Sequence, residues 1–158
     1  MATQSARVII YTDGACLGNP GPGGWAALLL AGNQEKVLRG GDPQTTNNRM
    51  ELTAAIRAFE SLKRPCEIDL YTDSEYLRRG ITEWLAGWKM RNWRRKDGVL
   101  ANADLWQRLD ELQSAHKVNW KWLRGHAGNA NNERVDRLAR QSIKDMHLER
   151  RTRGAGEN

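Results

Sequence analysis

Two similar stretches, VIIYTDG at residues 8–14 and IDLYTDS at residues 68–74, carry the same tripeptide, Tyr-Thr-Asp, at the end of an apolar run. Each is rich in strand-forming residues and ends in an aspartate that precedes a turn or helix-starting residue. Side chains alternate faces along a strand, so the Tyr and Asp of each copy share a face. If the two strands are parallel neighbours, Asp13 and Asp73 emerge at the same carboxyl edge, where open α/β sheets bind ligands.

Each aspartate taken alone has a simpler interpretation, as a turn former or a helix N-cap. Two like charges held side by side cost free energy unless a cation lies between them. The repeat therefore predicts a functional site only if further acidic residues are expected at the same place.

The composition is that of one globular domain with a basic surface. The chain has 158 residues, of which 39% are hydrophobic, and no apolar run approaches the length of a membrane span. The first residues lack the apolar segment of a signal peptide, so we expect a cytoplasmic protein with Cys16 and Cys66 as free thiols. A net charge of +6 suits a polyanionic partner, although it is a weak indication by itself.

Hydrophobic patterning predicts a single α/β domain over residues 1–147. The expected strands cover residues 6–13, 25–30, 35–39, 66–72 and 118–123, with a glycine- and proline-rich loop at 18–24. The expected helices lie between residues 45 and 65, at 74–88 with a joint at Gly80, at 103–115, and from Asn131 or Asn132 onward. The polar tail at 148–158 is expected to be disordered.

The order of these elements favours a mixed sheet flanked by helices. Short links join the first three strands into an antiparallel meander, whereas a long helix connects the third strand to the fourth. Such a crossover can place the fourth strand parallel to the first, which is the arrangement that Asp13 and Asp73 need.

Two more acidic residues lie beside buried helix faces. Glu51 borders the apolar face of its helix, and a capping box with Asn48 is the competing interpretation. Asp136 borders the apolar stripe of the last helix, where a first-turn acid favoured by the helix dipole is the alternative. Carboxylates are rarely buried without partners, so one pocket is predicted for Asp13, Glu51, Asp73 and Asp136. Four hard oxygen ligands suit Mg²⁺ or Mn²⁺ rather than zinc.

His126 is a candidate for moving protons. It lies in a loop with flanking glycines, between the fifth strand and the helix that carries Asp136. An imidazole in that place could transfer protons near neutral pH. A lone histidine is more often incidental, which is how we interpret His116 and His147.

Several blocks of sequence complete this pattern. They are Tyr11–Gly14 with Cys16–Gly24, Thr45–Leu52, Tyr71–Ser74, Asp104–Gln107, Gly125–Gly128, Asn132–Arg134 and Asp136. Together they resemble bacterial type 1 ribonuclease H, over about residues 6–146. The resemblance implies a five-stranded mixed sheet of order 3-2-1-4-5, with strand 2 antiparallel to the others.

The resemblance also implies an activity, namely a metal-dependent endonuclease that hydrolyses the RNA strand of RNA–DNA hybrids. The expected products carry 5′-phosphate and 3′-hydroxyl ends. Two Mg²⁺ ions, for which Mn²⁺ can substitute, are expected at Asp13, Glu51, Asp73 and Asp136, and His126 is expected to assist proton transfer or product departure. The resemblance further suggests a monomer that binds the hybrid duplex and no membrane.

The family reads the minor groove of the hybrid at positions that match Gly14, Cys16, Asn19, Asn47 and Glu75 of this sequence. A DNA phosphate pocket of the family matches Thr46 together with Asn47. Many relatives carry Gln where this chain has Glu75, and an ionised Glu accepts hydrogen bonds but cannot donate them. The contact at Glu75 therefore requires the 2′-hydroxyl to be the donor.

A basic segment at about residues 84–101 interleaves cations with tryptophans. The expected contacts to nucleic acid are Trp84, Trp88, Lys89, Arg91, Trp93, Arg94, Arg95 and Lys96. In the family a basic protrusion at this place holds the DNA strand. The alternative is a solvated basic loop beside core tryptophans, with Trp84 and Trp106 packed in the core.

Two other classes of function stay open at this point. A noncatalytic hybrid-binding module would keep the basic segment but lose acidic residues, whereas all four are present. A DNA nuclease on a related fold is disfavoured by the hybrid-specific blocks. Cleavage assays with hybrid, duplex DNA and duplex RNA would distinguish the three.

Overall fold

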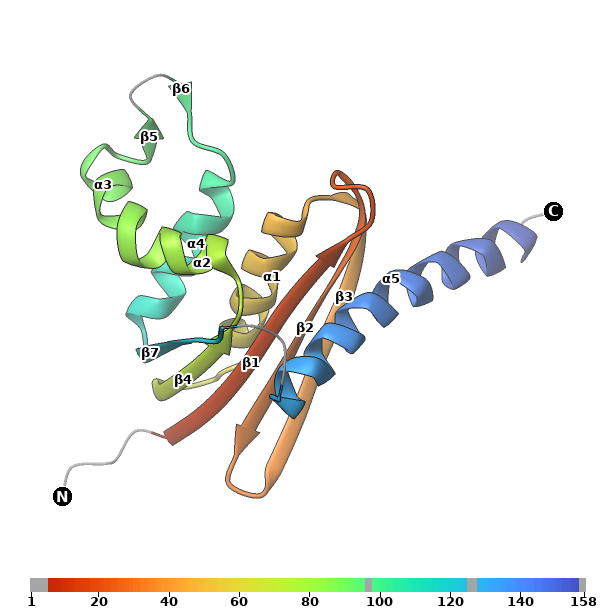
Figure 1. The fold of residues 1–158 in the computed structure, drawn as a ribbon, viewed down its shortest axis with the longest axis horizontal. Helices are drawn as coiled ribbons and strands as arrows, with labels where there is room; N and C mark the ends of the chain where they lie inside the picture. The colour runs from red at the N-terminus through yellow and green to blue at the C-terminus, as the bar shows by residue number, and fades with distance from the viewer. Residues whose placement is uncertain (1–5, 96–97, 125–127, 157–158) are drawn as a thin grey trace.

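A five-stranded mixed sheet forms the centre of the molecule (Figure 1). The computed structural model describes residues 6–95, 98–124 and 128–156. The large sheet has the order β3-β2-β1-β4-β7, and its strands are β1 (Ala6–Cys16), β2 (Gly21–Ala31), β3 (Gln34–Thr45), β4 (Cys66–Thr72) and β7 (Lys117–Trp122). Strand β2 is antiparallel to its neighbours, whereas β4 is parallel to β1 and to β7. The predicted strand order and mixed sheet are confirmed.

Helices cover both faces of this sheet. Helices α1 (Asn47–Glu60) and α4 (Ala103–Ser114) pack on one face, and α5 (Ala130–Gly156) crosses the other over β1, β2 and β3 (Figure 1). Leu52, Ala55 and Phe59 of α1 are buried against Ile10 and Ile68 of the sheet. This apolar contact, at i, i+3 and i+7 of the helix, explains why the crossover helix lies on the sheet and returns the chain parallel to β1.

The strands of the meander are longer than the sequence indicates. Strand β1 continues three residues past Asp13 to Cys16, and β2 begins at Gly21, so the predicted loop at 18–24 is wrong for residues 21–24. Glycine is required there because the sheet meets helix α5 closely. A Cβ on Gly24 would lie 2.1 Å from the Ala139 carbonyl oxygen. Asp13 is thus an interior strand residue rather than a turn former.

The predicted joint at Gly80 is a π-helical turn. Helix α2 (Glu75–Arg79) runs into η1 (Gly80–Trp84) and then into α3 (Leu85–Met90). A Cβ on Gly80 would lie 2.0 Å from the Trp106 ring, so only glycine lets this turn approach α4. Beyond α3 the irregular excursion contains one short pair of antiparallel strands, β5 (Arg94–Arg95) and β6 (Gly98–Val99).

Helix α5 differs from its prediction at both ends. Asn129, not Asn131 or Asn132, caps it, because the Asn132 N–H donates to Asn129 Oδ1 at 2.9 Å. The helix continues to Gly156, past residue 148, where the sequence indicates the start of the polar tail; disorder of that tail stays a prediction. The sequence has no proline after Pro65 and no glycine between Gly128 and Gly154, so nothing local ends the helix earlier. Among the described residues, no helix combines the length and apolar character needed to cross a membrane.

Candidate metal centre

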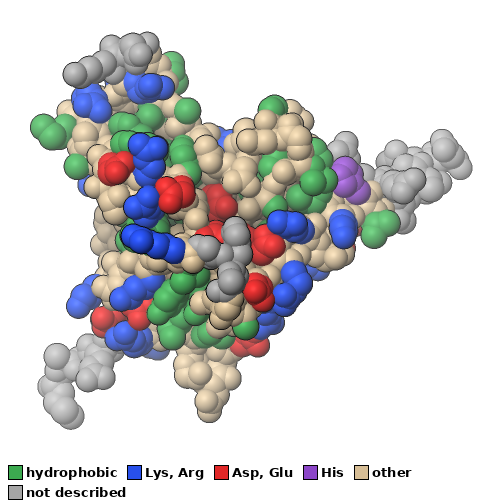
Figure 2. Space-filling view, viewed as in Figure 1, with side chains coloured by type: hydrophobic (Ala, Val, Ile, Leu, Met, Phe, Trp, Pro, Cys, Tyr) green, Lys and Arg blue, Asp and Glu red, His purple; other side chains and the backbone are tan. Residues whose placement is uncertain are grey.

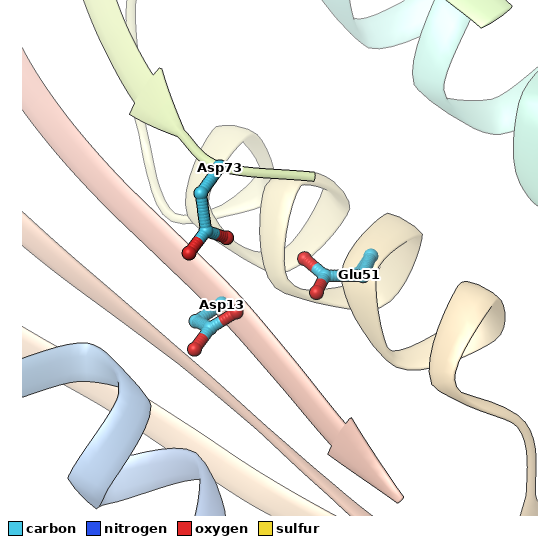
Figure 3. Close-up of side chains that lie close together, drawn as sticks. All are labelled: Asp13, Glu51 and Asp73. Atoms are coloured by element: carbon cyan, nitrogen blue, oxygen red, sulfur yellow. The ribbon is translucent and has the colours of Figure 1, made fainter. Parts of the chain in front are cut away.

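Three buried or half-buried carboxylates from three elements meet at the edge of the sheet. Asp13 lies in β1, Glu51 in α1, and Asp73 directly after β4. One oxygen of each lies within 4.8 Å of the others, and the three side chains converge in Figure 3. The prediction that acids distant in sequence form one cluster is therefore supported by the geometry of these three.

Glu51 belongs to the carboxylate cluster and is not a helix cap. The N-cap of α1 is Thr46, whose Oγ1 accepts from the Arg49 N–H at 3.2 Å, so the capping box with Asn48 does not form. Glu51 is 5% exposed and its Oε2 is buried without a hydrogen-bond partner among the described residues. A buried carboxylate oxygen that lacks a partner costs free energy, and a bound cation would remove that cost.

Gly14 brings α1 close enough for Glu51 to reach Asp13. A Cβ at this position would lie 2.5 Å from the Glu51 backbone nitrogen and 2.6 Å from the Met50 carbonyl carbon. Both atoms belong to backbone, so neither could move aside. Gly14 is therefore required for the close packing of α1 on β1 that places Glu51 beside Asp13.

Asp73 does not cap a helix either. Ser74 caps α2, accepting the Leu77 N–H on its Oγ at 3.1 Å. The Asp73 carboxylate instead turns toward Asp13, and its Oδ2 accepts a hydrogen bond from Asn132 Nδ2 at 3.4 Å. Asn132 is 2% exposed, and its own Oδ1 is buried without a partner among the described residues.

Asp136 completes the same cavity from α5. A cavity of about 590 Å³ is lined by all four predicted acids and, on its α5 side, by Arg140 and Lys144. Asp136 lies outside the 4.8 Å group, but its carboxyl is close enough to Asp13 to raise the pKa of that residue. It occupies the second turn of α5, so the first-turn dipole interpretation does not apply.

The electrostatics of the cluster indicate a cation site. Burial, followed by the charges of Asp73 and Asp136, raises the pKa of Asp13 to about 8. Burial, with the charges of Asp13 and Asp73, also raises the pKa of Glu51 well above its usual value. Carboxylates in this position bind protons when no cation is present and release them when one binds. Oxygen donors alone fit a hard divalent ion such as Mg²⁺ or Mn²⁺.

The predicted minor-groove residues lie along one side of this centre. Gly14, Cys16 and Asn47 line the cavity of the acids. Asn19 accepts the Asn47 N–H on its Oδ1 at 2.9 Å, next to the cap residue Thr46. The loop 18–20 and the start of α1 therefore form one continuous surface. His126 and Lys96 lie outside the described residues.

Glu75 is exposed and lines a further cavity together with Asn47, Glu51 and Asp73. Its carboxylate forms an ion pair with Arg78, with 2.9 Å between Glu75 Oε2 and Arg78 Nη2. The charge that distinguishes Glu75 from the Gln of relatives is therefore offset within α2.

The basic segment combines a buried aromatic base with exposed cations. Trp88 packs on the fully buried Trp106, and Trp84 lies half-buried against both Trp88 and Tyr76. The exposed cations among the described residues of this segment are Lys89, which pairs with Asp110, and Arg91, Arg94 and Arg95, whereas Trp93 is half-buried. Of the two tryptophans that the alternative placed in the core, Trp106 is fully buried and Trp84 is half-buried. Arg91 and Arg95 line a surface cavity of about 660 Å³ with Trp84 and Trp88.

Sequence reasoning missed three residues of the site, Asn132, Arg140 and Lys144. Asn132 was assigned to capping because Asn is a favoured N-cap and the true cap is three residues earlier. Arg140 and Asp136 are four residues apart on one helix, a spacing that could have indicated their contact, and Arg140 Nε donates to Asp136 Oδ1 at 3.3 Å.

The fold and these acids define a metal-dependent protein in which an α/β sheet carries oxygen ligands for a divalent ion. The family model for RNase H matches residues 5–144, and this chain belongs to the ribonuclease H family. It is a nuclease, a hydrolase of phosphodiester bonds with ribonuclease H activity on RNA–DNA hybrids.

Relatives of known name support the family assignment along almost the whole chain. Ribonuclease H of Halorhodospira halophila is 62% identical over 147 residues, covering 92% of this chain and 99% of the relative. Ribonuclease H of Polaromonas sp. is 58% identical over 144 residues, covering 89% and 91%. Among solved structures, LC9-RNase H1, a type 1 RNase H with the type 2 active-site motif, has a TM-score of 0.83 and 34% identity, covering 92% of this chain and 75% of that one.

Proposed function

We propose that this chain cleaves the RNA strand of RNA–DNA hybrids endonucleolytically with two Mg²⁺ ions, leaving 5′-phosphate and 3′-hydroxyl ends. The observation that carries the proposal is the approach of the Asp13, Glu51 and Asp73 carboxylates to within 4.8 Å. The solved fold neighbour LC11-RNase H1, 23% identical with a TM-score of 0.66 over 88% of this chain and 98% of that one, was determined in complex with an RNA/DNA hybrid.

Asp13 is the central ligand in this proposal, because its carboxyl interacts with those of Glu51, Asp73 and Asp136. The four acids would hold the ions, and Mn²⁺ is able to replace Mg²⁺. Bound ions would activate the attacking water and stabilise the leaving 3′ oxygen. The chain itself orients the carboxylates, through the β1–β4 register, the close approach at Gly14 and the Asn132 side chain.

His126 is proposed to accept or deliver a proton, or to speed product departure. Its place in the sequence puts it between β7, which ends beside β4, and α5, which carries Asp136. A neutral imidazole can take up a proton near pH 7. A His126→Ala variant is expected to lose turnover while keeping its affinity for the hybrid.

The proposed surface for recognising the RNA strand consists of Gly14, Cys16, Asn19 and Asn47. Glu75 would accept a hydrogen bond from a 2′-hydroxyl of that strand. Thr46 would contact a phosphate of the DNA strand. Only the RNA strand offers that hydroxyl. The proposed contacts of the basic segment are Trp84, Trp88, Lys89, Arg91, Trp93, Arg94, Arg95 and Lys96. Exposed cations beside aromatic rings suit a nucleic-acid backbone.

One assay tests the activity. The purified chain is incubated with Mg²⁺ and end-labelled hybrid, duplex DNA or duplex RNA, beside Asp13→Asn and Asp73→Asn. We expect cleavage of the hybrid alone, phosphatase-sensitive 5′ ends on the downstream products, and no cleavage but retained binding by both variants. Turnover by either variant would refute the roles of these acids. Function as a cytoplasmic monomer stays a prediction.

A further inference from the structure

A second cavity adjoins the metal centre, between the end of β4, helix α2 and the residues that follow β7. It has a volume of about 560 Å³ and is lined by Thr72, Asp73, Ser74, Glu75, Arg78, Trp122, Leu123 and Arg124. It shares Asp73 with the cavity that holds the acids. Any ligand that occupied it would therefore lie next to the reacting bond.

The charges of this second cavity are those of an anion site. Arg78 lies in α2, and Arg124 follows β7 by two residues. Among the described residues, Glu75 pairs with one terminal nitrogen of Arg78, which leaves further guanidinium donors for a ligand. Arg124 is exposed and forms no salt bridge within the described part of the chain. Two guanidinium groups favour a phosphate, which they can bind through several donors.

The cavity of the acids has its own pair of cations at the opposite end, Arg140 and Lys144. The molecule thus carries a basic pair on each side of the carboxylates. Figure 2 shows acidic side chains near the middle of one face with Lys and Arg on both sides. A nucleic-acid strand continues in both directions from the bond that is cut, so its neighbouring phosphates need cationic partners on both sides of the metal centre.

We propose that the cavity lined by Arg78, Trp122 and Arg124 binds the backbone phosphate that neighbours the scissile phosphate of the cleaved strand. This inference rests on the proposed function. Arg124 supplies the main contact, Arg78 supplies a second one beside its pair with Glu75, and the half-buried Trp122 offers an apolar wall to the sugar. The opposite neighbour of the scissile phosphate lies toward Arg140 and Lys144.

The test pairs protein variants with hybrids in which one phosphate near the cut is replaced by an uncharged methylphosphonate. The proteins are wild type, Arg124→Ala, Arg124→Lys and Arg64→Ala. Arg64 is an exposed arginine before β4, at the opposite end of that strand from Asp73. Arg64→Ala is therefore the control, because it lowers the net charge by the same amount as Arg124→Ala at a distant position. Both kcat/KM in Mg²⁺ and Kd in Ca²⁺ are measured for each pair.

We expect Arg124→Ala to weaken binding about 3- to 10-fold, to reduce the salt slope by about one, and to act mainly on Kd and KM. The loss should vanish when one particular phosphate beside the cut is already neutral, because two changes to one contact are not additive. Arg124→Lys should recover part of the affinity, and Arg64→Ala should match wild type.

Additive losses at every phosphate near the cut, or an Arg124→Ala protein indistinguishable from Arg64→Ala, would overturn the inference. Failure of the wild type to cleave the hybrid would refute the proposed function instead. The Kd cycle would still decide the phosphate contact in that case, because it requires no turnover.

Discussion

The aromatic rings of Tyr11 and Tyr71 stack with their centroids 4.8 Å apart and their planes inclined by 11°. They are direct partners in the parallel register of β1 and β4. Asp13 and Asp73 each follow two residues later, so the two carboxylates leave the sheet at the same level and on the same face. The position of these two carboxylates therefore depends on the strand register, and the stacked rings stabilise that register beside them.

Replacing Asp13 by Asn is expected to stabilise the metal-free protein. The pKa of Asp13 is raised in the folded state to about 8, above the unfolded value of about 4, so folding takes up a proton. The free energy of unfolding of the wild type should fall as pH rises from about 4 to 8. Asn removes the buried charge and should raise the free energy of unfolding at pH 8 by about 1–3 kcal/mol.

Urea unfolding in EDTA at pH 5.5 and pH 8 measures this effect. Glu149→Gln, the same loss of a carboxylate at an exposed position, is the control and should change little. A variant no more stable than wild type at pH 8 would show that the Asp13 charge carries no such cost.

Divalent ions should compete with protons at the same carboxylates. Because burial and neighbouring charges raise the pKa of both Asp13 and Glu51, binding of Mg²⁺ near pH 7 should release protons. Affinity should fall as pH decreases from 8 to 6, by up to about tenfold per pH unit for each proton released. Calorimetry in buffers of different ionisation enthalpy measures the released protons. An affinity independent of pH over this range would contradict the prediction.

Local patterns predicted the strands and the three acids that cluster in the structure, whereas the full sheet order followed from the family resemblance. Apolar alternation gave the strands, and the helix between β3 and β4 required a parallel return. The uncertainty at each acid was whether it capped a helix. Thr46 and Ser74 serve as caps in the structure, which leaves Glu51 and Asp73 for the site. Several nearby residues can cap equally well, so the sequence alone did not decide this.

Contacts between distant elements could not be predicted in the same way. The strand at Gly21–Gly24 exists because α5 packs against it, and glycine by itself indicates a loop. The contact between Asn132 and Asp73 depends on where α5 begins, and a shift of the cap by two or three residues turns a side chain to another face.

Asn132→Ala should weaken the metal centre without changing hybrid binding. The amide of Asn132 is buried and donates to Asp73 Oδ2, so it holds the orientation of that carboxylate. Loss of a residue that orients a metal ligand reduces metal affinity or activity by about tenfold or more. Titration of activity with Mg²⁺ should move to higher concentration at an unchanged KM for the hybrid. Asn131→Ala on the neighbouring residue is the control, and an unchanged Mg²⁺ titration would rule out the positioning role.

Gly24→Ala should separate α5 from the sheet. Its Cβ would meet the Ala139 carbonyl oxygen at 2.1 Å, and that oxygen is helix backbone. We expect a loss of stability of about 2 kcal/mol or more, together with lower activity because α5 carries Asp136. Gly87→Ala is the control, since its Cβ would meet only the flexible Arg91 side chain, at 3.2 Å. Thermal unfolding of both variants gives the comparison, and equal midpoints would contradict the close packing at Gly24.

Neutralising Arg94 and Arg95 should weaken hybrid binding and flatten its salt dependence. Both residues are exposed in the short strand β5, and Arg95 lines the cavity formed with Trp84 and Trp88. Each lost phosphate contact should reduce the slope of log K against log salt by about 0.7 to 0.9. The metal centre is built from other elements, so the concentration of Mg²⁺ needed for half-maximal activity should stay the same.

The control for this double variant is Lys63→Ala with Arg64→Ala, which removes two exposed cations from the link between α1 and β4. It lowers the net charge equally but should leave the salt slope close to that of wild type. An identical slope for both double variants would mean that the basic segment acts only through overall charge. A smaller slope for Arg94→Ala/Arg95→Ala alone would place phosphates of the hybrid at β5, because counterion release counts local contacts.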